Sequence, residues 1–157
     1  MPFYQLIQTQ KIPTSIAEVW DFISSPGNLK NITPPYMGFI ITSTNASDKM
    51  YAGMIITYKV SPLLGIKLNW VTEITQVKNQ EYFIDEQRVG PYKMWHHQHK
   101  IEAMAGGVLM TDIVSYQSPW GKLGALANVL FIKRQLKRIF DFRTIALERR
   151  FGKYYSA

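Results

Sequence analysis

The chain of 157 residues contains no cysteine, which excludes disulfide bonds, thiolate metal sites and thiol nucleophiles. It also lacks any apolar run near the roughly twenty residues that a membrane-spanning helix needs. The N-terminus reads Met-Pro-Phe-Tyr-Gln and shows no basic and then apolar pattern of a signal peptide. We therefore expect a cytoplasmic protein without a transmembrane segment, and the missing cysteines agree with a reducing compartment.

Motifs for nucleotide binding and for several common enzyme classes are absent as well. Gly106-Gly107 has the character of a hairpin turn, and no P-loop or dinucleotide fingerprint is present. No nucleophile elbow or zinc-protease helix motif occurs either. The sequence therefore predicts no cofactor.

The net charge of +7 raises the question of a polyanionic partner. Much of this charge lies near the C-terminus, at Lys133, Arg134, Lys137, Arg138, Arg149, Arg150 and Lys153. A solvated helix face explains this run more simply than nucleic acid does. We expect no nucleic-acid partner, while a peripheral membrane contact through the basic face stays open.

The longest uninterrupted segment, Trp120 to Gly152, predicts a C-terminal helix between Pro119 and a final glycine. Its second half has an apolar stripe at helical spacing, with Arg143 inside the stripe. The stripe consists of Leu136, Ile139, Phe140, Leu147 and Phe151.

The first half of this helix, Leu123 to Ile132, is apolar nearly all round. This pattern predicts a bend near Lys133 or a segment covered on two sides. It fits a lid over a cavity, a contact between two copies of the chain, or burial beneath Asn28–Tyr36. We favour burial.

The remaining chain reads as one strand, two short helices and a series of strands. Phe3–Ile12 is the first strand, Ser15 and Glu18 have capping-box spacing at the start of a helix, and Asn28–Thr33 is a second short helix. Turn-rich breaks, such as 45–48 and 61–65, imply antiparallel neighbours. The expected strands are Phe39–Thr44, Met54–Val60, Ile66–Val77, Glu81–Val89, Tyr92–Met104 and Val108–Ser118. Without a repeat or linker, residues 1–157 are expected to form a single domain.

Alternation along the strands separates two faces of the predicted sheet. Trp70, Thr72, Ile74 and Gln76 share one face of their strand, and His97 and His99 share a face from which His96 points away. The aromatic-rich face also carries polar groups, namely Asp85, Gln87, His97, His99 and Asp112. Since buried ionisable groups are costly unless paired, they indicate an internal network or a wet cavity beneath the helix.

This order of elements resembles the helix-grip fold of the START-like, polyketide cyclase and birch-pollen-allergen superfamily, over the whole chain, and in particular a bacterial subgroup of START-like proteins. The residues that carry the resemblance are Trp70 and Ile74, Phe83-Ile84-Asp85-Glu86-Gln87 with Gly90-Pro91-Tyr92, Trp95-His96-His97-Gln98-His99, Gly106-Gly107 with Asp112 and Tyr116, and Ile139-Phe140-Asp141-Phe142-Arg143. The resemblance implies an α+β fold in which a curved antiparallel sheet wraps around the C-terminal helix. It also implies a ligand of lipid, polyketide or aromatic type between the two, although the fold does not specify an activity.

We therefore expect a protein that binds a small hydrophobic or amphipathic molecule. The expected lining residues are Tyr58, Trp70, Phe83, Asp85, Gln87, Trp95, His97, His99, Asp112, Tyr116, Phe140 and Arg143. The alternative is a cyclase or dehydratase in which His97 or His99, oriented by Asp85 or Asp112, is the acid–base group and Tyr116 donates to a developing enolate.

Two polar groups have competing interpretations. His97 and His99 with Asp112 have the chemistry of a zinc or iron site, but we favour a hydrogen-bonded His–Asp pair that holds the cavity wall together, and no metal is expected. Arg143 is either an anchor for an acidic ligand or the ion-pair partner of Asp85 or Asp112. We favour the internal pair, because a lone buried cation is expensive.

Overall fold

The computed structural model describes residues 2–45, 48–61, 65–119 and 121–156, and within them it contains one seven-stranded antiparallel sheet. The strand order is β1-β7-β6-β5-β4-β3-β2. Strands β2 to β7 form a meander, and the last strand, β7, pairs with the first strand, β1, which forms the other edge of the sheet. The strands are β1 Tyr4–Ile12, β2 Ile40–Ile41, β3 Met54–Val60, β4 Leu68–Lys78, β5 Tyr82–Val89, β6 Met94–Met104 and β7 Gly107–Gln117.

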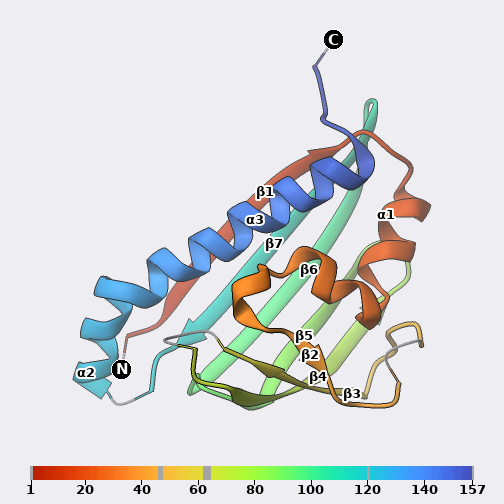
Figure 1. Ribbon diagram of the computed structural model, residues 1–157. Helices are drawn as coiled ribbons and strands as arrows, with labels where there is room; N and C mark the ends of the chain where they lie inside the picture. The colour runs from red at the N-terminus through yellow and green to blue at the C-terminus, as the bar shows by residue number, and fades with distance from the viewer. Residues whose placement is uncertain (1, 46–47, 62–64, 120, 157) are drawn as a thin grey trace.

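The helical segments lie on one side of this sheet (Figure 1). They are α1 Ile16–Ile23, the 3₁₀ turns η1 Pro26–Ile32 and η2 Pro35–Met37, α2 Gly121–Ala127, the π-helical turn η3 Asn128–Ile132, and α3 Lys133–Phe151. The expected capping box at the start of α1 is present, since Ser15 and Glu18 bond to each other's backbone amides. The expected start of the long helix at Trp120, and the turn positions 46–47 and 62–64, lie outside the described residues.

A β-bulge corrects one part of the face assignment. The register between β4 and β5 shifts between Ile74 and Gln76. Because an extra residue reverses the alternation that follows it, Gln76 is exposed instead of sharing the inner face with Trp70. Val77 packs against the core in its place.

Helix α3 lies over the concave face of the sheet and runs alongside β1 and β7 (Figure 1). Leu136, Phe140 and Leu147 are buried in the contact, as the apolar stripe predicts. Arg143 lies on the same buried side and is only 8% exposed. The helix therefore carries one cation into the interior of the molecule.

The predicted burial of the first half of the long helix is wrong. The large apolar side chains there are exposed: Leu123 73%, Leu126 57%, Val129 71%, Leu130 50% and Phe131 57%. This segment extends beyond the end of the sheet, and none of the described helices and strands covers it there (Figure 1). The helix changes direction at the π-helical turn η3, immediately before Lys133, where a bend was expected. Its roles as a lid or as a contact between copies stay predictions.

Gly124 in α2 shows how this segment is attached. A Cβ atom at this position would lie 1.7 Å from the carbonyl oxygen of Pro119. Only glycine permits such a close approach of helix and preceding chain.

Within the part of the chain that the structure describes, no helix is both long and apolar enough to cross a membrane.

Candidate functional site

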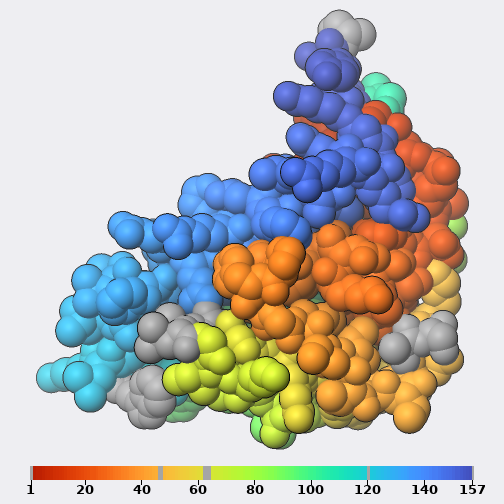
Figure 2. All heavy atoms as spheres, in the orientation of Figure 1, coloured from red at the N-terminus to blue at the C-terminus, as the bar shows by residue number. Residues whose placement is uncertain are grey.

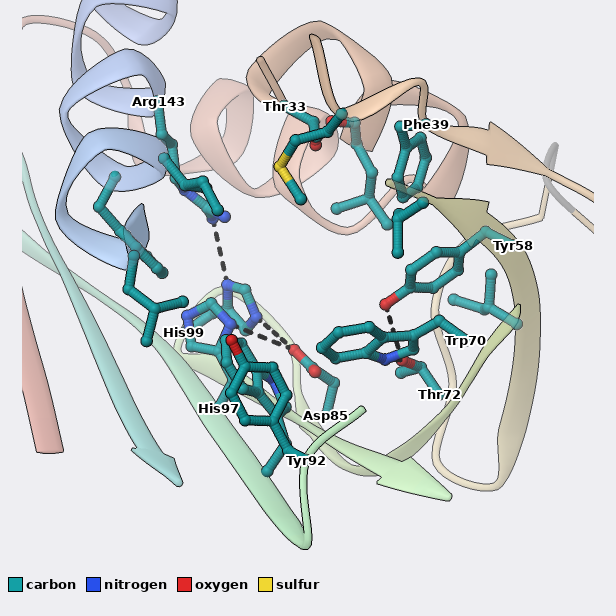
Figure 3. Close-up of a pocket in the computed structure, with 18 of the residues that line it drawn as sticks. Thr33, Phe39, Tyr58, Trp70, Thr72, Asp85, Tyr92, His97, His99 and Arg143 are labelled. Carbon is teal, nitrogen blue, oxygen red and sulfur yellow. Dashed lines mark hydrogen bonds and ion pairs between the residues drawn. The ribbon is translucent and has the colours of Figure 1, made fainter. Parts of the chain in front are cut away.

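A cavity of about 150 Å³ lies between the sheet and α3 (Figure 3). Its walls come from strands β3 to β6, from helix α3, and from the segment around η1 and η2. Nine of the residues that we expected at the site line it: Tyr58, Trp70, Phe83, Asp85, Trp95, His97, His99, Phe140 and Arg143. The cavity is apolar over most of its wall and polar at one end, where Asp85, the two histidines and Arg143 lie.

The aromatic end is built from rings that contact one another. Tyr58 stacks on Trp70 with ring centroids 5.9 Å apart, and Trp95 meets Trp70 edge-on at 5.4 Å. Thr72 contacts both Tyr58 and Trp70: its Oγ1 is 3.0 Å from the Tyr58 hydroxyl and accepts a 3.1 Å hydrogen bond from Trp70 Nε1. Burial, with the nearby charge of Asp85, raises the pKa of the Tyr58 hydroxyl, which therefore stays protonated and can donate.

Strand register brings the polar end together. His97 and His99 occupy alternate positions of β6 and face inward. Asp85 of β5 is the cross-strand partner of His97, and Asp112 of β7 is the cross-strand partner of His99. The two imidazoles therefore stand side by side, with ring centroids 3.7 Å apart, between two carboxylates.

Each histidine contacts both carboxylates through its two ring nitrogens. On the Asp85 side, Oδ2 is 2.6 Å from His99 Nε2 and 3.5 Å from His97 Nδ1. On the Asp112 side, Oδ1 is 2.9 Å from His97 Nε2 and 3.2 Å from His99 Nδ1. A neutral imidazole has only one N–H group, so two neutral rings cannot donate in all four contacts.

Arg143 points from α3 toward His99 (Figure 3). Its Nη2 lies 3.4 Å from Asp112 Oδ1 and 3.2 Å from His99 Nδ1. The expected internal ion pair is therefore confirmed, with Asp112 as the partner. The Nε–H of Arg143 is buried and has no hydrogen-bond partner, which leaves one donor of a buried cation unsatisfied.

These contacts determine the charges at the polar end. Burial raises the pKa of the Asp112 carboxyl, but Arg143 and the hydrogen bonds from both histidines outweigh it and hold that pKa well below its usual range. Burial also opposes ionisation of Asp85, whose pKa is nevertheless lowered by the hydrogen bond from His99 and by the nearby imidazoles and Arg143. Burial and the neighbouring His99 lower the pKa of His97 to about 4. His97 is therefore a neutral imidazole between two carboxylates at neutral pH.

Three expected residues do not line the cavity. Gln87 bonds the backbone of Tyr92 in both directions, at 2.7 and 3.2 Å, and so holds the turn between β5 and β6. Asp112 lies behind the histidines, and the Tyr116 hydroxyl donates a 2.8 Å hydrogen bond to Asn128. The sequence did not single out Tyr92, Thr33 or Gln135 as wall residues. Alternation along β4 places Thr72, another wall residue, on the inner face. It gives no signal for Tyr92 and Thr33, which lie outside the strands, or for Gln135 on α3.

The fold recurs in proteins of solved structure. Ginseng major latex-like protein 151, from Panax ginseng, is 13% identical with a TM-score of 0.68, over 95% of this chain and 97% of that chain. A protein from Chromobacterium violaceum is 10% identical with a TM-score of 0.71, over 96% and 99%. Ara h 8.0201 is 13% identical with a TM-score of 0.59, over 94% and 99%.

At these identities the likeness establishes the fold alone. The chain has the helix-grip fold, so the predicted fold is confirmed. No protein-family model and no curated protein matches the sequence.

Proposed function

We propose that the protein binds a small amphipathic molecule between the sheet and α3, with an apolar ring against Trp70 and an oxygen acceptor toward Arg143. The observation that supports this most directly is the unpaired Nε–H of Arg143, on a buried cation whose side chain lines the cavity. A ligand oxygen would satisfy this donor, because a buried N–H without a partner costs about 1–3 kcal/mol.

The size of the cavity limits the ligand. About 150 Å³ is the volume of a cavity that accepts one benzene ring in an engineered protein core. A single-ring aromatic acid or ketone fits without movement of the walls. A long lipid chain requires that α3 and the η2 segment move apart.

Charge limits the polar group as well. Leaving the two imidazoles aside, the carboxylates of Asp85 and Asp112 and the cation of Arg143 sum to one negative charge. A carboxylate ligand would add a second negative charge and would therefore bring a proton with it. A carbonyl or phenol group needs no such proton uptake.

The test is native mass spectrometry of the protein, followed by denaturation and identification of any released molecule. Ile56→Phe fills the cavity from β3, whereas Ile55→Phe adds the same ring on the outer face of that strand. We expect a bound small molecule in the wild type and in Ile55→Phe, and its loss in Ile56→Phe. Equal retention by both variants would show that the molecule binds elsewhere and would contradict the proposal.

The second candidate is an enzyme of the cyclase or dehydratase type. The neutral imidazole of His97, in contact with the cavity and hydrogen-bonded to Asp112 at 2.9 Å, supports it. Such a base would remove a proton from a carbon next to a ligand carbonyl, with Arg143 stabilising the enolate oxygen. Turnover of a polyketone probe should collapse in His97→Gln while its binding falls only modestly. Weaker binding in His97→Gln, with no turnover by the wild type or by any variant, supports the binding protein instead.

A further inference from the structure

Three potential metal ligands converge at the polar end of the cavity. One ligand atom from each of Asp85, His97 and His99 lies within 4.8 Å of the other two. All three residues line the cavity. A set of two histidines and one carboxylate that leaves coordination positions open is typical of catalytic zinc and non-haem iron sites.

The opposite nitrogens of both rings supply a second, independent observation. His97 Nε2 and His99 Nδ1 approach the same oxygen of Asp112, at 2.9 and 3.2 Å. Histidines that bind a metal usually donate their other N–H to a carboxylate, which fixes the ring and the tautomer. Asp112 is placed to accept from both rings at once, and Arg143 offsets its charge from behind.

This orientation leaves two lone pairs directed at a third electron-rich group. If both N–H groups bond Asp112, then His97 Nδ1 and His99 Nε2 face Asp85 Oδ2 as acceptors, at 3.5 and 2.6 Å. Three acceptors in this arrangement repel one another unless a proton or a metal ion lies between them.

We propose that Asp85, His97 and His99 bind a divalent transition-metal ion of the zinc or ferrous type, with Asp112 as the carboxylate that orients both imidazoles. Metal bonds of about 2.0–2.2 Å need ligand atoms about 3.0–3.5 Å apart, so the 2.6 Å contact opens by about 0.4–0.9 Å on binding. The remaining coordination positions face the cavity and accept a ligand oxygen.

The same strands carry a matched control on their outer face. His96 Nδ1 lies 3.0 Å from Glu86 Oε1, one position along from the inner pairing. This pair has one imidazole instead of two, and its side chains are about one-third exposed.

The experiment titrates chelator-treated protein with Zn²⁺ and with Co²⁺, followed by calorimetry and by the visible absorption of bound cobalt. We expect one ion per chain in the wild type and in His96→Gln. Binding should be lost in Asp85→Asn and His99→Gln, and Asp112→Asn should weaken it about 10- to 100-fold. Circular dichroism checks that each variant is folded, and Asp85→Glu, which keeps the carboxylate, should retain binding.

Absence of binding by the wild type, or equal binding by Asp85→Asn, would overturn the proposal. Absence of binding would mean that a proton on His99 Nε2 occupies the contact with Asp85, with Arg143 donating to His99 Nδ1 at 3.2 Å. Equal binding by Asp85→Asn would mean that the ion binds at another place. The titration uses the metal alone, so its failure would leave the proposed ligand cavity intact.

A different region carries a second inference. The segment formed by α2 and η3 projects from the body of the molecule (Figure 2). Its exposed large apolar residues, called here the apolar arm, are Leu123, Leu126, Val129, Leu130 and Phe131. No acidic residue occurs between Asp112 and Asp141, and the cations of this stretch are all exposed: Lys122, Lys133, Arg134, Lys137 and Arg138. An exposed apolar helix bordered by cations is complementary to an anionic lipid surface.

We infer that the apolar arm inserts into the interface of an anionic membrane. The arm leads directly into the part of α3 that lines the cavity at Gln135 and Leu136. Contact with lipid therefore takes place beside the proposed ligand site, although membrane binding itself does not depend on that site.

Flotation with phosphatidylcholine vesicles, with and without phosphatidylglycerol, tests this inference. We expect binding only with phosphatidylglycerol, a decrease at high salt, and at least about tenfold weaker binding in Leu123→Ser/Val129→Ser and in Lys133→Glu/Arg134→Glu. The controls are Ile40→Ser/Ile55→Ser and Arg149→Glu/Lys153→Glu, which should bind like the wild type. Absence of vesicle binding would overturn the inference. A dimer in light scattering that dissociates in Leu123→Ser/Val129→Ser would also overturn it, because the apolar arm would then contact a second copy of the chain.

Discussion

The two faces of strands β5 and β6 carry the same chemistry in different surroundings. On the inner face, Asp85 pairs across the strands with His97, and on the outer face Glu86 pairs with His96. The inner side chains of Asp85 and His97 are 15% and 6% exposed, whereas the outer ones are both near 30%. An arginine completes each group, with Arg143 inside and Arg88 outside.

The difference shows how burial changes what an ion pair does. In water-exposed pairs, screening reduces the interaction to about 0–1 kcal/mol. In buried pairs, removal of one partner leaves a charge that nothing compensates. Removal of one partner from the inner group is therefore expected to cost more stability than removal of one partner from the outer group.

Removal of the two arginines should separate the faces most strongly. We expect Arg143→Met to lower the free energy of unfolding by about 3–5 kcal/mol, because Asp112 loses the cation that offsets its buried charge. Arg88→Met on the outer face should cost about 0–1 kcal/mol. Urea unfolding measures both, and equal losses would show that burial does not govern the difference. If Arg143→Met does not fold, Arg143→Lys keeps the charge and should recover part of the loss.

The pH dependence of stability should come mainly from the inner face. Burial and His99 lower the pKa of His97 from 6.5 to about 4, in surroundings that also include Asp85, Asp112 and Arg143. The unfolded chain therefore binds more protons between these values, so the stabilisation is complete above about pH 6.5 and is lost as the pH falls toward 4. The loss is on the order of 3 kcal/mol.

Unfolding in urea at a series of pH values measures this loss. His97→Gln should flatten the profile between pH 6.5 and 4 relative to the wild type. His96→Gln removes an imidazole from the outer face and serves as the control. An unchanged slope in His97→Gln would assign the dependence to other groups. The lowered pKa values of Asp85 and Asp112 add a further loss, which begins as the pH falls through their usual value of 3.8 and continues below it.

The aromatic end of the cavity offers a smaller, uncharged test. Thr72→Val keeps the volume but removes the acceptor of the Trp70 Nε1 hydrogen bond and the partner of the Tyr58 hydroxyl. We expect a loss of about 1–3 kcal/mol, because Trp70 is buried and its donor would be left without a partner. Thr57→Val, in the exposed contact of Thr57 with Thr42, is the control and should cost less. Chemical denaturation of the two variants compares them.

Alternation along the strands was sufficient to predict which histidines point inward. His97 and His99 fall on one face and His96 on the other in any regular strand. The choice between Asp85 and Asp112 as partners could not be made, because it depends on the register across two hairpins. The bulge before Gln76 was equally invisible, since nothing in the local sequence marks the extra residue.

The helix was predicted well where it has a sheet beneath it and poorly where it has none. The apolar stripe placed Leu136, Phe140 and even Arg143 on the buried side. The run from Leu123 to Ile132 has the composition of a buried segment, yet it extends beyond the sheet (Figure 1). Composition describes what a segment is able to bury, whereas the tertiary arrangement decides whether anything covers it.

The smallest expected effect is also the sharpest check on the comparison. Glu86→Gln preserves size and hydrogen bonding but removes the charge that faces His96 at 3.0 Å and Arg88 at 3.2 Å. Because these side chains are about one-third exposed or more, water and salt replace the lost interaction, and we expect a change of about 0–1 kcal/mol. Asp85→Asn makes the same chemical change one position away, among buried partners, and should cost clearly more. A double-mutant cycle of Glu86→Gln with His96→Gln should give a coupling that shrinks with added salt, and a large salt-independent coupling would mean that the outer pair behaves like the inner one.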